Sequence, residues 1–232
     1  MSAKLARWAK KLDLVDIVAP FTRQDLQAIG VRGIQFGSWD GRQPFCLNTD
    51  IVPLACEDTE TENGRIYRVD GESYFIRLDA CKPLPFATDS IEWIYAEHMI
   101  EHIALTDAMR WTREVKRMLR PGGLLRITTP DLGKYIAGYL HDDGFFARHR
   151  EACMKAGIPL ENRRAFMVNQ IFCLHGHRWI YDFDELCYVL GLAGFQADSI
   201  AERAFREGAI PEIAGMDREF RREETIYIEA LA

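Results

Sequence analysis

The sequence lacks the features that mark several classes of protein. None of its six cysteines forms a C-x-x-C pair, which argues against zinc-ribbon and disulfide scaffolds and favours reduced thiols. No apolar run is long enough to cross a bilayer, and the N-terminus has no small-residue cleavage site of a signal peptide. No internal repeat or low-complexity tract is visible. We therefore expect a cytoplasmic globular protein with no membrane partner.

The sequence also has fewer basic than acidic residues. The chain has 29 Lys and Arg against 35 Asp and Glu, for a net charge of −6. A surface of this sign repels the phosphates of a nucleic acid, so no nucleic-acid partner is expected. Nothing in the sequence indicates an oligomeric state.

What the sequence does have is enough apolar material for one α/β domain. It is 232 residues long and 48% hydrophobic. Apolar runs alternate with helical patterns, which predicts strands over 32–36, 45–49, 74–78, 90–97, 124–129, 195–201 and 225–231. Helical spacing predicts helices over 3–18 and 182–192, and a helical insertion, or lid, within 131–180. We divide the chain into an N-terminal helical segment, 1–30, and one domain, 31–232.

Two polar stretches are predicted to be exposed. Residues 56–72 contain Asn63-Gly64 and Asp70-Gly71, dipeptides that favour tight turns, and are predicted to form an exposed excursion before the third strand. Residues 217–224 carry charges of both signs and are predicted to form a solvated connection before the last strand.

Polar residues follow the predicted strands where an open α/β sheet binds its ligand. Gly37 ends the first strand, Asp50 ends the second and Asp79-Ala80 follow the third. An adenosine-bearing ligand needs a close backbone approach, which glycine permits, and an acceptor for its ribose hydroxyls. Gly37 and Asp50 have the residue types for these two tasks.

The order of these elements resembles the class I S-adenosylmethionine-dependent methyltransferases, of the type 11-like, small-molecule kind. The resemblance covers about residues 33 to 130 and includes the Leu84-Pro85-Phe86 turn, Glu97-His98 and Glu101-His102; residues from 195 onward fit the closing strands. It implies a Rossmann-like fold with a mainly parallel, seven-stranded sheet. The last strand is then antiparallel, and 195–201 pairs with 225–231.

The resemblance also implies the cofactor and its contacts. S-adenosylmethionine is expected as cofactor and S-adenosylhomocysteine as product, with Asp50 on the ribose and Asp79-Ala80 at the adenine. The full set of expected cofactor residues is Phe36, Gly37, Ser38, Asp50, Ile51, Asp79, Ala80, Cys81, Glu97, His98 and His102.

The chain departs from the family pattern in its first loop. The family has G-x-G-x-G, whereas Gly37-Ser38-Trp39-Asp40-Gly41 places an indole at the second glycine. The gap between the first two strands is too short for a crossover helix, so a shortened connection is predicted. A dinucleotide-binding fold is disfavoured because the chain has no G-x-G-x-x-G turn.

The resemblance and the histidines together suggest transfer to oxygen in a small-molecule acceptor. Such an acceptor must lose a proton, and histidine is the usual base. The candidates are His175 and His177, with His98 as a third; in an extended stretch the first two would point to the same face. Trp39, Tyr135, Arg178 and Tyr181 are the candidate substrate-binding residues.

Two alternatives stay open. The protein could be a non-catalytic scaffold that keeps the fold, which Trp39 in the glycine loop would explain. His175-Gly176-His177 could instead hold a metal in a hydrolase, with Asp131, Asp182 or Glu101 as further ligands. No third ligand lies at a fixed spacing, so the main interpretation includes no metal ligand.

Overall fold

The computed structural model describes residues 7–57 and 59–232, which divide into two compact units. The first unit contains the described residues up to Ala96, with 110–125 and 231–232. The second contains 97–109 and 126–230. Strands β9 (Ile91–Glu97) and β10 (Leu119–Pro130) and helix α2 (Leu105–Met118) contribute residues to both units, which are described separately.

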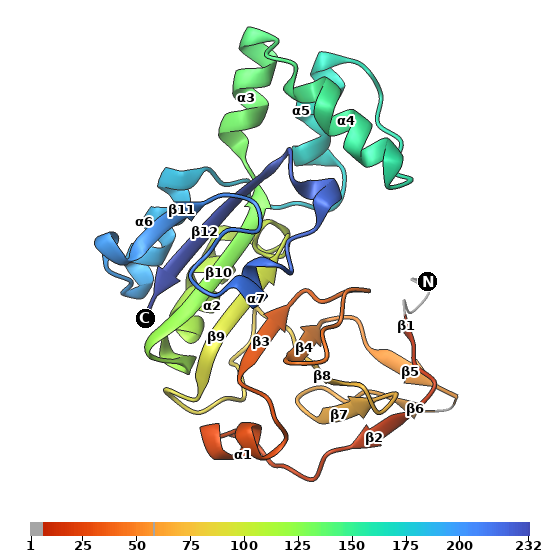
Figure 1. Cartoon of the computed structure of the whole chain (residues 1–232), viewed down its shortest axis with the longest axis vertical. Helices are drawn as coiled ribbons and strands as arrows, with labels where there is room; N and C mark the ends of the chain where they lie inside the picture. Colours follow the sequence, from red (N-terminus) through yellow and green to blue (C-terminus); the bar gives the residue numbers. More distant parts are fainter. Residues whose placement is uncertain (1–6, 58) are drawn as a thin grey trace. The chain divides into compact units, whose positions relative to one another are not determined.

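The first unit is built on a mainly parallel sheet with the strand order β10-β9-β3-β4-β8-β7-β2 (Figure 1). Its further strands are β2 (Leu12–Leu14), β3 (Gly33–Phe36), β4 (Leu47–Asp50), β7 (Ile66–Val69) and β8 (Ser73–Arg77). β3 pairs in parallel with both β4 and β9, and β4 pairs in parallel with β8. The strands predicted at 32–36, 45–49, 74–78 and 90–97 are thus confirmed to within a few residues.

The order of these strands reverses at β3. From β3 the chain adds β4 and then β8 in one direction, and afterwards returns to the other side of β3 with β9. In doubly wound sheets this reversal point, at the carboxyl ends of the strands, is where ligands bind. β3, β4 and β9 are buried at every residue, and Phe36 meets Trp111 edge to face at 5.5 Å.

The helix predicted over 3–18 is wrong for the described part of that segment. Residues 3–6 lie outside the described residues, and β1 (Arg7–Trp8) and β2 occupy the rest. Asp70 explains part of this, because its Oδ1 accepts hydrogen bonds from the backbone of Lys10 and Lys11 at 2.8 Å. Trp8, which the helical pattern placed on the apolar face, is 72% exposed. β1 belongs to a small sheet with β5 (Leu54–Cys56) and β6 (Thr59–Glu60). Helix α1 (Arg23–Ala28) belongs to this unit together with part of α2.

The stretch 56–72 is not an exposed excursion throughout. It contains β7, which pairs antiparallel with β8 and buries Ile66, Tyr67 and Val69. β2 then pairs antiparallel with β7. These two strands extend the sheet beyond β8, so the main sheet has nine strands rather than the predicted seven.

The second unit combines the end of β10 with an antiparallel pair and the predicted helical insertion. β12 (Thr225–Leu231) pairs antiparallel with β11 (Ile200–Arg203), as predicted, although the strand expected at 195–201 begins only at Ile200. The insertion consists of α3 (Leu132–His141), α4 (Phe145–Lys155) and α5 (Arg164–Cys173), which lie together in Figure 1. The remaining helices are η1 (Ile100–His102), α6 (Phe183–Ala193), η2 (Ala197–Ser199), α7 (Pro211–Ala214) and η3 (Glu219–Arg221).

A buried ion network ties the 217–224 segment to β10. Arg126 is fully buried, and its guanidinium donates to Asp217 at 2.5 and 3.1 Å and to Glu229 at 3.1 Å. Asp217 is only 1% exposed, so the prediction of a solvated connection was wrong at this residue. The negative charge of Asp217 can be buried because the guanidinium of Arg126 is buried beside it and compensates it.

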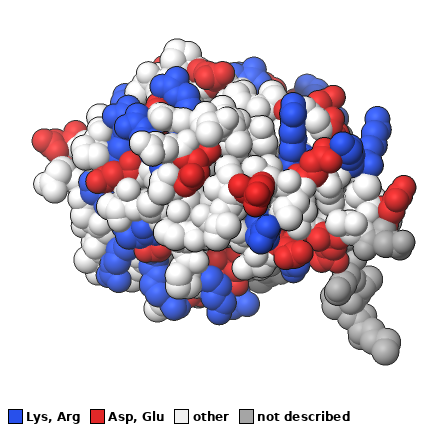
Figure 2. Space-filling view, turned by 90° about the horizontal axis from the view of Figure 1, so that it is seen from below, with Lys and Arg blue, Asp and Glu red and all other residues white. Residues whose placement is uncertain are grey.

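The surface charges are mixed in sign. On the face drawn in Figure 2, Lys and Arg side chains alternate with Asp and Glu side chains. Among the described residues, no helix combines the length and the apolar character needed to cross a membrane.

Candidate functional site

In the first unit, the loop after β3 is drawn toward the end of β4. Trp39 donates its backbone N–H to Asp50 Oδ2 at 2.9 Å, and Ser38 donates its own to the Thr49 carbonyl at 3.0 Å. Gly37 has a φ of 68°, which favours glycine. Trp39 has a φ of 42°, so the residue that replaces the second glycine keeps a left-handed backbone. As predicted, no helix connects these two strands.

The ends of β4 and β8 lie side by side. The Leu78 N–H donates to the Asp50 carbonyl at 3.0 Å, which places Asp79 next to the end of β4. Asp79 Oδ1 accepts the N–H of Cys81 at 2.9 Å and closes a tight turn. Asp79, Ala80 and Cys81 are all half-buried. We call Gly37, Asp50, Ile51, Asp79 and Ala80 the strand-end cluster.

The predicted cofactor residues of this unit differ in exposure. Asp50 is 8% exposed, and each of its carboxylate oxygens accepts one backbone N–H, from Trp39 or from Val52. The next residue, Ile51, is 59% exposed and offers an apolar surface. Two other predicted cofactor residues, Phe36 and Ser38, are 2% and 0% exposed, and their contact with the cofactor stays a prediction.

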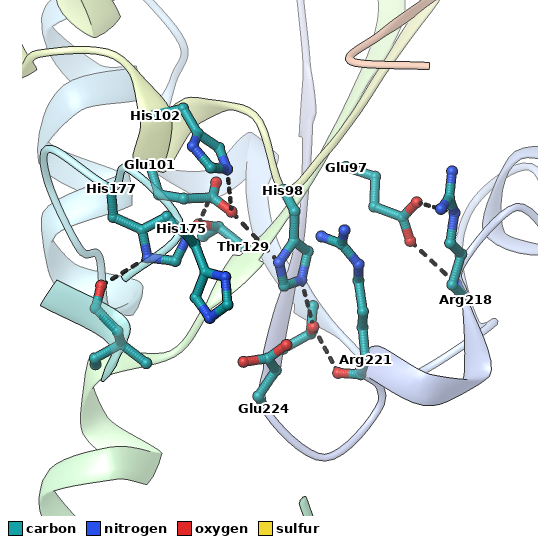
Figure 3. A network of polar contacts seen from close by, with 12 residues as sticks. Glu97, His98, Glu101, His102, Thr129, His175, His177, Arg218, Arg221 and Glu224 are labelled. Atoms are coloured by element: carbon teal, nitrogen blue, oxygen red, sulfur yellow. Dashed lines mark hydrogen bonds and ion pairs between the residues drawn. The ribbon is translucent and has the colours of Figure 1, made fainter. Parts of the chain in front are cut away.

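The other predicted cofactor residues belong to the second unit, where Glu97 and His98 already have protein partners (Figure 3). Arg218 contacts the Glu97 carboxylate through its backbone N–H at 3.1 Å and its Nε at 2.9 Å. Burial raises the pKa of Glu97. His98 Nε2 lies 2.8 Å from Thr225 Oγ1, and burial lowers the pKa of His98 well below its usual range. The contact of these two residues with the cofactor stays a prediction.

Glu101 is the buried centre of a group of histidines. It has no exposed surface, and its Oε2 accepts a hydrogen bond from Thr129 Oγ1 at 3.0 Å. Its Oε1 lies 3.3 Å from His98 Nδ1 and 4.0 Å from His102 Nε2. Burial raises the pKa of Glu101 to about 8. We call His98, Glu101, His102, His175 and His177 the histidine cluster.

The loop that carries His175 and His177 turns instead of running extended. His175 and Gly176 have φ values of 63° and 76°, so the prediction of an extended stretch was wrong. The turn nevertheless leaves the two rings 5.6 Å apart, and it places His177 edge to face on His102 at 4.8 Å. The loop is held to Glu101, whose carbonyl accepts the Arg178 N–H at 2.7 Å.

A chain of hydrogen bonds orients the His175 ring. His175 Nε2 lies 3.1 Å from Gln170 Oε1, and Gln170 Nε2 donates to the Tyr135 hydroxyl at 3.1 Å. That hydroxyl donates to Glu224 Oε2 at 2.7 Å and lies 3.0 Å from His149 Nε2. Because the amide oxygen of Gln170 can only accept, Nε2 of His175 carries the hydrogen and Nδ1 is left as an acceptor.

The structure separates the four candidate substrate residues by exposure. Trp39 is 46% exposed and Arg178 is exposed, whereas Tyr135 and Tyr181 are both 0% exposed. The Tyr135 hydroxyl is occupied by protein partners, and the buried Tyr181 hydroxyl has no hydrogen-bond partner. An open pocket of about 460 Å³ in the second unit is lined by Asp131, Gly133, Lys134, Ala137, Asp143, Phe145, Arg148, Arg222 and Glu223, a set without these four residues.

The structure brings together a different set of possible metal ligands from the one expected from the sequence. Among the described residues, Glu101, His102 and His177 each offer a ligand atom, and these atoms lie within 4.8 Å of one another. His102 therefore takes the place expected for His175, and Asp131 and Asp182 are not in the group.

Several polar residues of this site were not found from the sequence. Thr129, Gln170 and Glu224 contact the cluster or its hydrogen-bond chain, and Thr225 contacts His98. These four residues come from segments far from Glu101 in the sequence, so no local motif indicates them. Only the Glu101-His102 pair was visible as a motif.

Comparison with known proteins gives one family match. Residues 29–127 match the family model described as methyltransferase domain. No curated protein matches the chain. Among solved structures, an S-adenosylmethionine-dependent methyltransferase from Mesorhizobium loti is 17% identical, with a TM-score of 0.48 and coverage of 90% of this chain and 96% of that one.

Two further solved structures are similar at lower identity. A possible histamine N-methyltransferase from Thermotoga maritima is 13% identical, with a TM-score of 0.45 and coverage of 92% of this chain and 89% of that one. A Haemonchus contortus phosphoethanolamine N-methyltransferase, solved with phosphomonomethylethanolamine and S-adenosylhomocysteine, is 13% identical, with a TM-score of 0.47 and coverage of 87% and 49%.

Proposed function

We propose that this chain is an S-adenosylmethionine-dependent enzyme that methylates an oxygen atom of a small-molecule acceptor. The match of residues 29–127 to the family model described as methyltransferase domain supports the proposal. The observation that carries the proposal is the strand-end cluster, in which Asp50 ends β4 and Asp79 follows the neighbouring strand β8. This position and these residue types suit a nucleoside.

Each residue of the strand-end cluster has its own task in holding the cofactor. The Asp50 carboxylate would hold the ribose hydroxyls, and Ile51, Asp79 and Ala80 would hold the adenine. Gly37 allows the backbone to approach closely. When bound, S-adenosylmethionine supplies a methyl group activated by a sulfonium. The chain must then position the acceptor, exclude water and remove a proton.

His175 is the better candidate for the general base. Its Nε2 is engaged with Gln170, so Nδ1 is ready to accept the acceptor's proton. The ring is exposed, as a base that meets a substrate must be. His177 is a weaker base because burial lowers its pKa to about 4, well below a working pH near 7.

The test is an acceptor panel of phenols, alcohols, carboxylic acids and amines, incubated with S-adenosylmethionine and analysed by mass spectrometry. We expect a methylated product from an oxygen acceptor, with the methyl located by fragmentation, and a much smaller yield from His175→Ala. Products methylated only at nitrogen or carbon would overturn the choice of oxygen. Equal yields from both proteins would remove His175 as the base.

The scaffold alternative is favoured by one observation, the indole of Trp39 in the cofactor loop. A scaffold would bind S-adenosylmethionine and S-adenosylhomocysteine with no turnover on any acceptor of the panel. Calorimetric titration of both compounds beside the product assay separates the two functions.

A further inference from the structure

The buried carboxylate of Glu101 faces imidazole nitrogens. Its Oε2 is occupied by Thr129, but its Oε1 accepts no hydrogen bond, although Glu101 has no exposed surface. The nearest polar atoms to Oε1 include His98 Nδ1 at 3.3 Å and His102 Nε2 at 4.0 Å. A buried carboxylate oxygen normally has a donor or a cation beside it.

His98 cannot supply that donor in its neutral form. Thr225 gives its one hydroxyl hydrogen to the Arg221 carbonyl at 2.7 Å, so toward His98 it can only accept. The hydrogen of the neutral imidazole is therefore on Nε2, 2.8 Å from Thr225 Oγ1. Nδ1 is left with a lone pair that points at Glu101 Oε1. Two acceptors at this distance require a proton or a cation between or beside them.

The ring of His177 is oriented with a free lone pair. His177 Nδ1 donates to the Ile171 carbonyl at 2.6 Å, which leaves its Nε2 as an acceptor. His102 is the second imidazole beside Glu101, and its Nε2 faces the carboxylate at 4.0 Å. Histidines that bind metals usually donate their second N–H to a carbonyl in this way, because the bond fixes the ring and its tautomer.

We propose that Glu101, His102 and His177 bind a divalent transition-metal ion, with Zn²⁺ as the expected ion. Two imidazoles and one carboxylate form a common zinc ligand set, and three protein ligands leave a position open for water or another oxygen. The ligand atoms lie within 4.8 Å of one another, whereas tetrahedral zinc separates its ligands by about 3.4 Å. The side chains must therefore close by roughly 1 Å, which the 41% exposed His102 and the turn at His177 permit. This site does not depend on the proposed methyl transfer.

The experiment uses the full chain, stripped with a chelator and dialysed. Titration with Zn²⁺ by calorimetry, and with Co²⁺ by its visible absorption, is expected to give one ion per chain. His102→Ala, His177→Ala and Glu101→Gln should each weaken Zn²⁺ binding by at least about tenfold, consistent with the loss of a ligand. His141→Ala removes an exposed histidine outside the group and should bind like the wild type.

Two results would overturn the proposal. One is the absence of stoichiometric Zn²⁺ or Co²⁺ binding by the folded wild-type chain, and the other is equal binding by the wild type and the three ligand variants. Circular dichroism shows whether each variant is folded, and Glu101→Gln keeps the shape of the buried side chain if an alanine variant is not. Titration with S-adenosylhomocysteine is run separately, so a failure of cofactor binding is distinguished from a failure of the metal site.

Discussion

The strand-end cluster and the histidine cluster differ in how the chain builds them. In the first, each residue lies where a strand ends, and short backbone hydrogen bonds to Asp50 and Asp79 hold the turns. In the second, side chains from three distant segments meet around the buried Glu101. Local sequence therefore determines the first site, whereas tertiary packing determines the second. Substitutions should separate the two, because we propose that the first holds the cofactor and that the second carries the base.

The largest expected effect is on turnover. His175→Ala removes the exposed base and should lower kcat by about 10² to 10⁴-fold, the usual contribution of a general base. Affinity for S-adenosylhomocysteine should be unchanged, since the strand-end cluster is intact. Steady-state kinetics with the acceptor from the panel, beside calorimetry, measures both. Full turnover in the variant would show that His175 does not remove the proton of the acceptor.

The second largest effect is expected on the stability of the second unit. Arg126→Met leaves Asp217 and Glu229 buried without their cation and should lower the free energy of unfolding by about 3 to 5 kcal/mol. Urea denaturation measures the change. Arg148→Met is the matched control, because Arg148 pairs with Glu223 on an exposed surface and should contribute at most about 1 kcal/mol. Equal losses in the two variants would show that burial of the network contributes nothing extra.

A smaller effect is expected on cofactor binding in the first unit. Asp50→Ala should weaken S-adenosylhomocysteine binding by about 1 to 3 kcal/mol, because the ribose hydroxyls lose a buried acceptor. Calorimetry with the exposed Glu72→Ala as control measures it. Affinity equal to that of the wild type would remove Asp50 from the site.

The smallest effect is a pH dependence confined to the second unit. Burial lowers the pKa of His149 below its ordinary 6.5, so below that pH the unfolded chain binds more protons than the folded one. The contribution of His149 to stability is therefore present above pH 6.5 and is lost as the pH falls. Urea unfolding at pH 7.5 and 5.5 should show a smaller loss for His149→Gln than for the wild type. Parallel losses would assign the pH dependence to other groups.

The comparison also explains which features could be predicted from the sequence. The strands around Gly37, Asp50 and Asp79 were predicted because buried apolar runs end there in polar residues, and both signals are local. β2 was missed because Leu12 and Leu14 lie in a segment whose apolar spacing also fits a helix, and only Asp70 and β7 decide between the two.

The histidine cluster shows the limit of a local pattern. His175 and His177 were correctly expected close together, but through an extended backbone instead of the turn at Gly176. The surroundings of Glu101 depend on which distant segments pack against η1, and no spacing in the sequence records that. Asp217 is a similar case, because its charged neighbours suggested solvent while Arg126, 91 residues away, makes burial possible.

The central claim is that the ends of β3, β4 and β8 hold the nucleoside of the cofactor. The most direct test is a crystal structure of the chain with S-adenosylhomocysteine. We predict the ribose hydroxyls on the Asp50 carboxylate, with the adenine against Ile51 and beside Asp79-Ala80. A nucleoside bound elsewhere, or a chain that does not bind the compound at all, would contradict it.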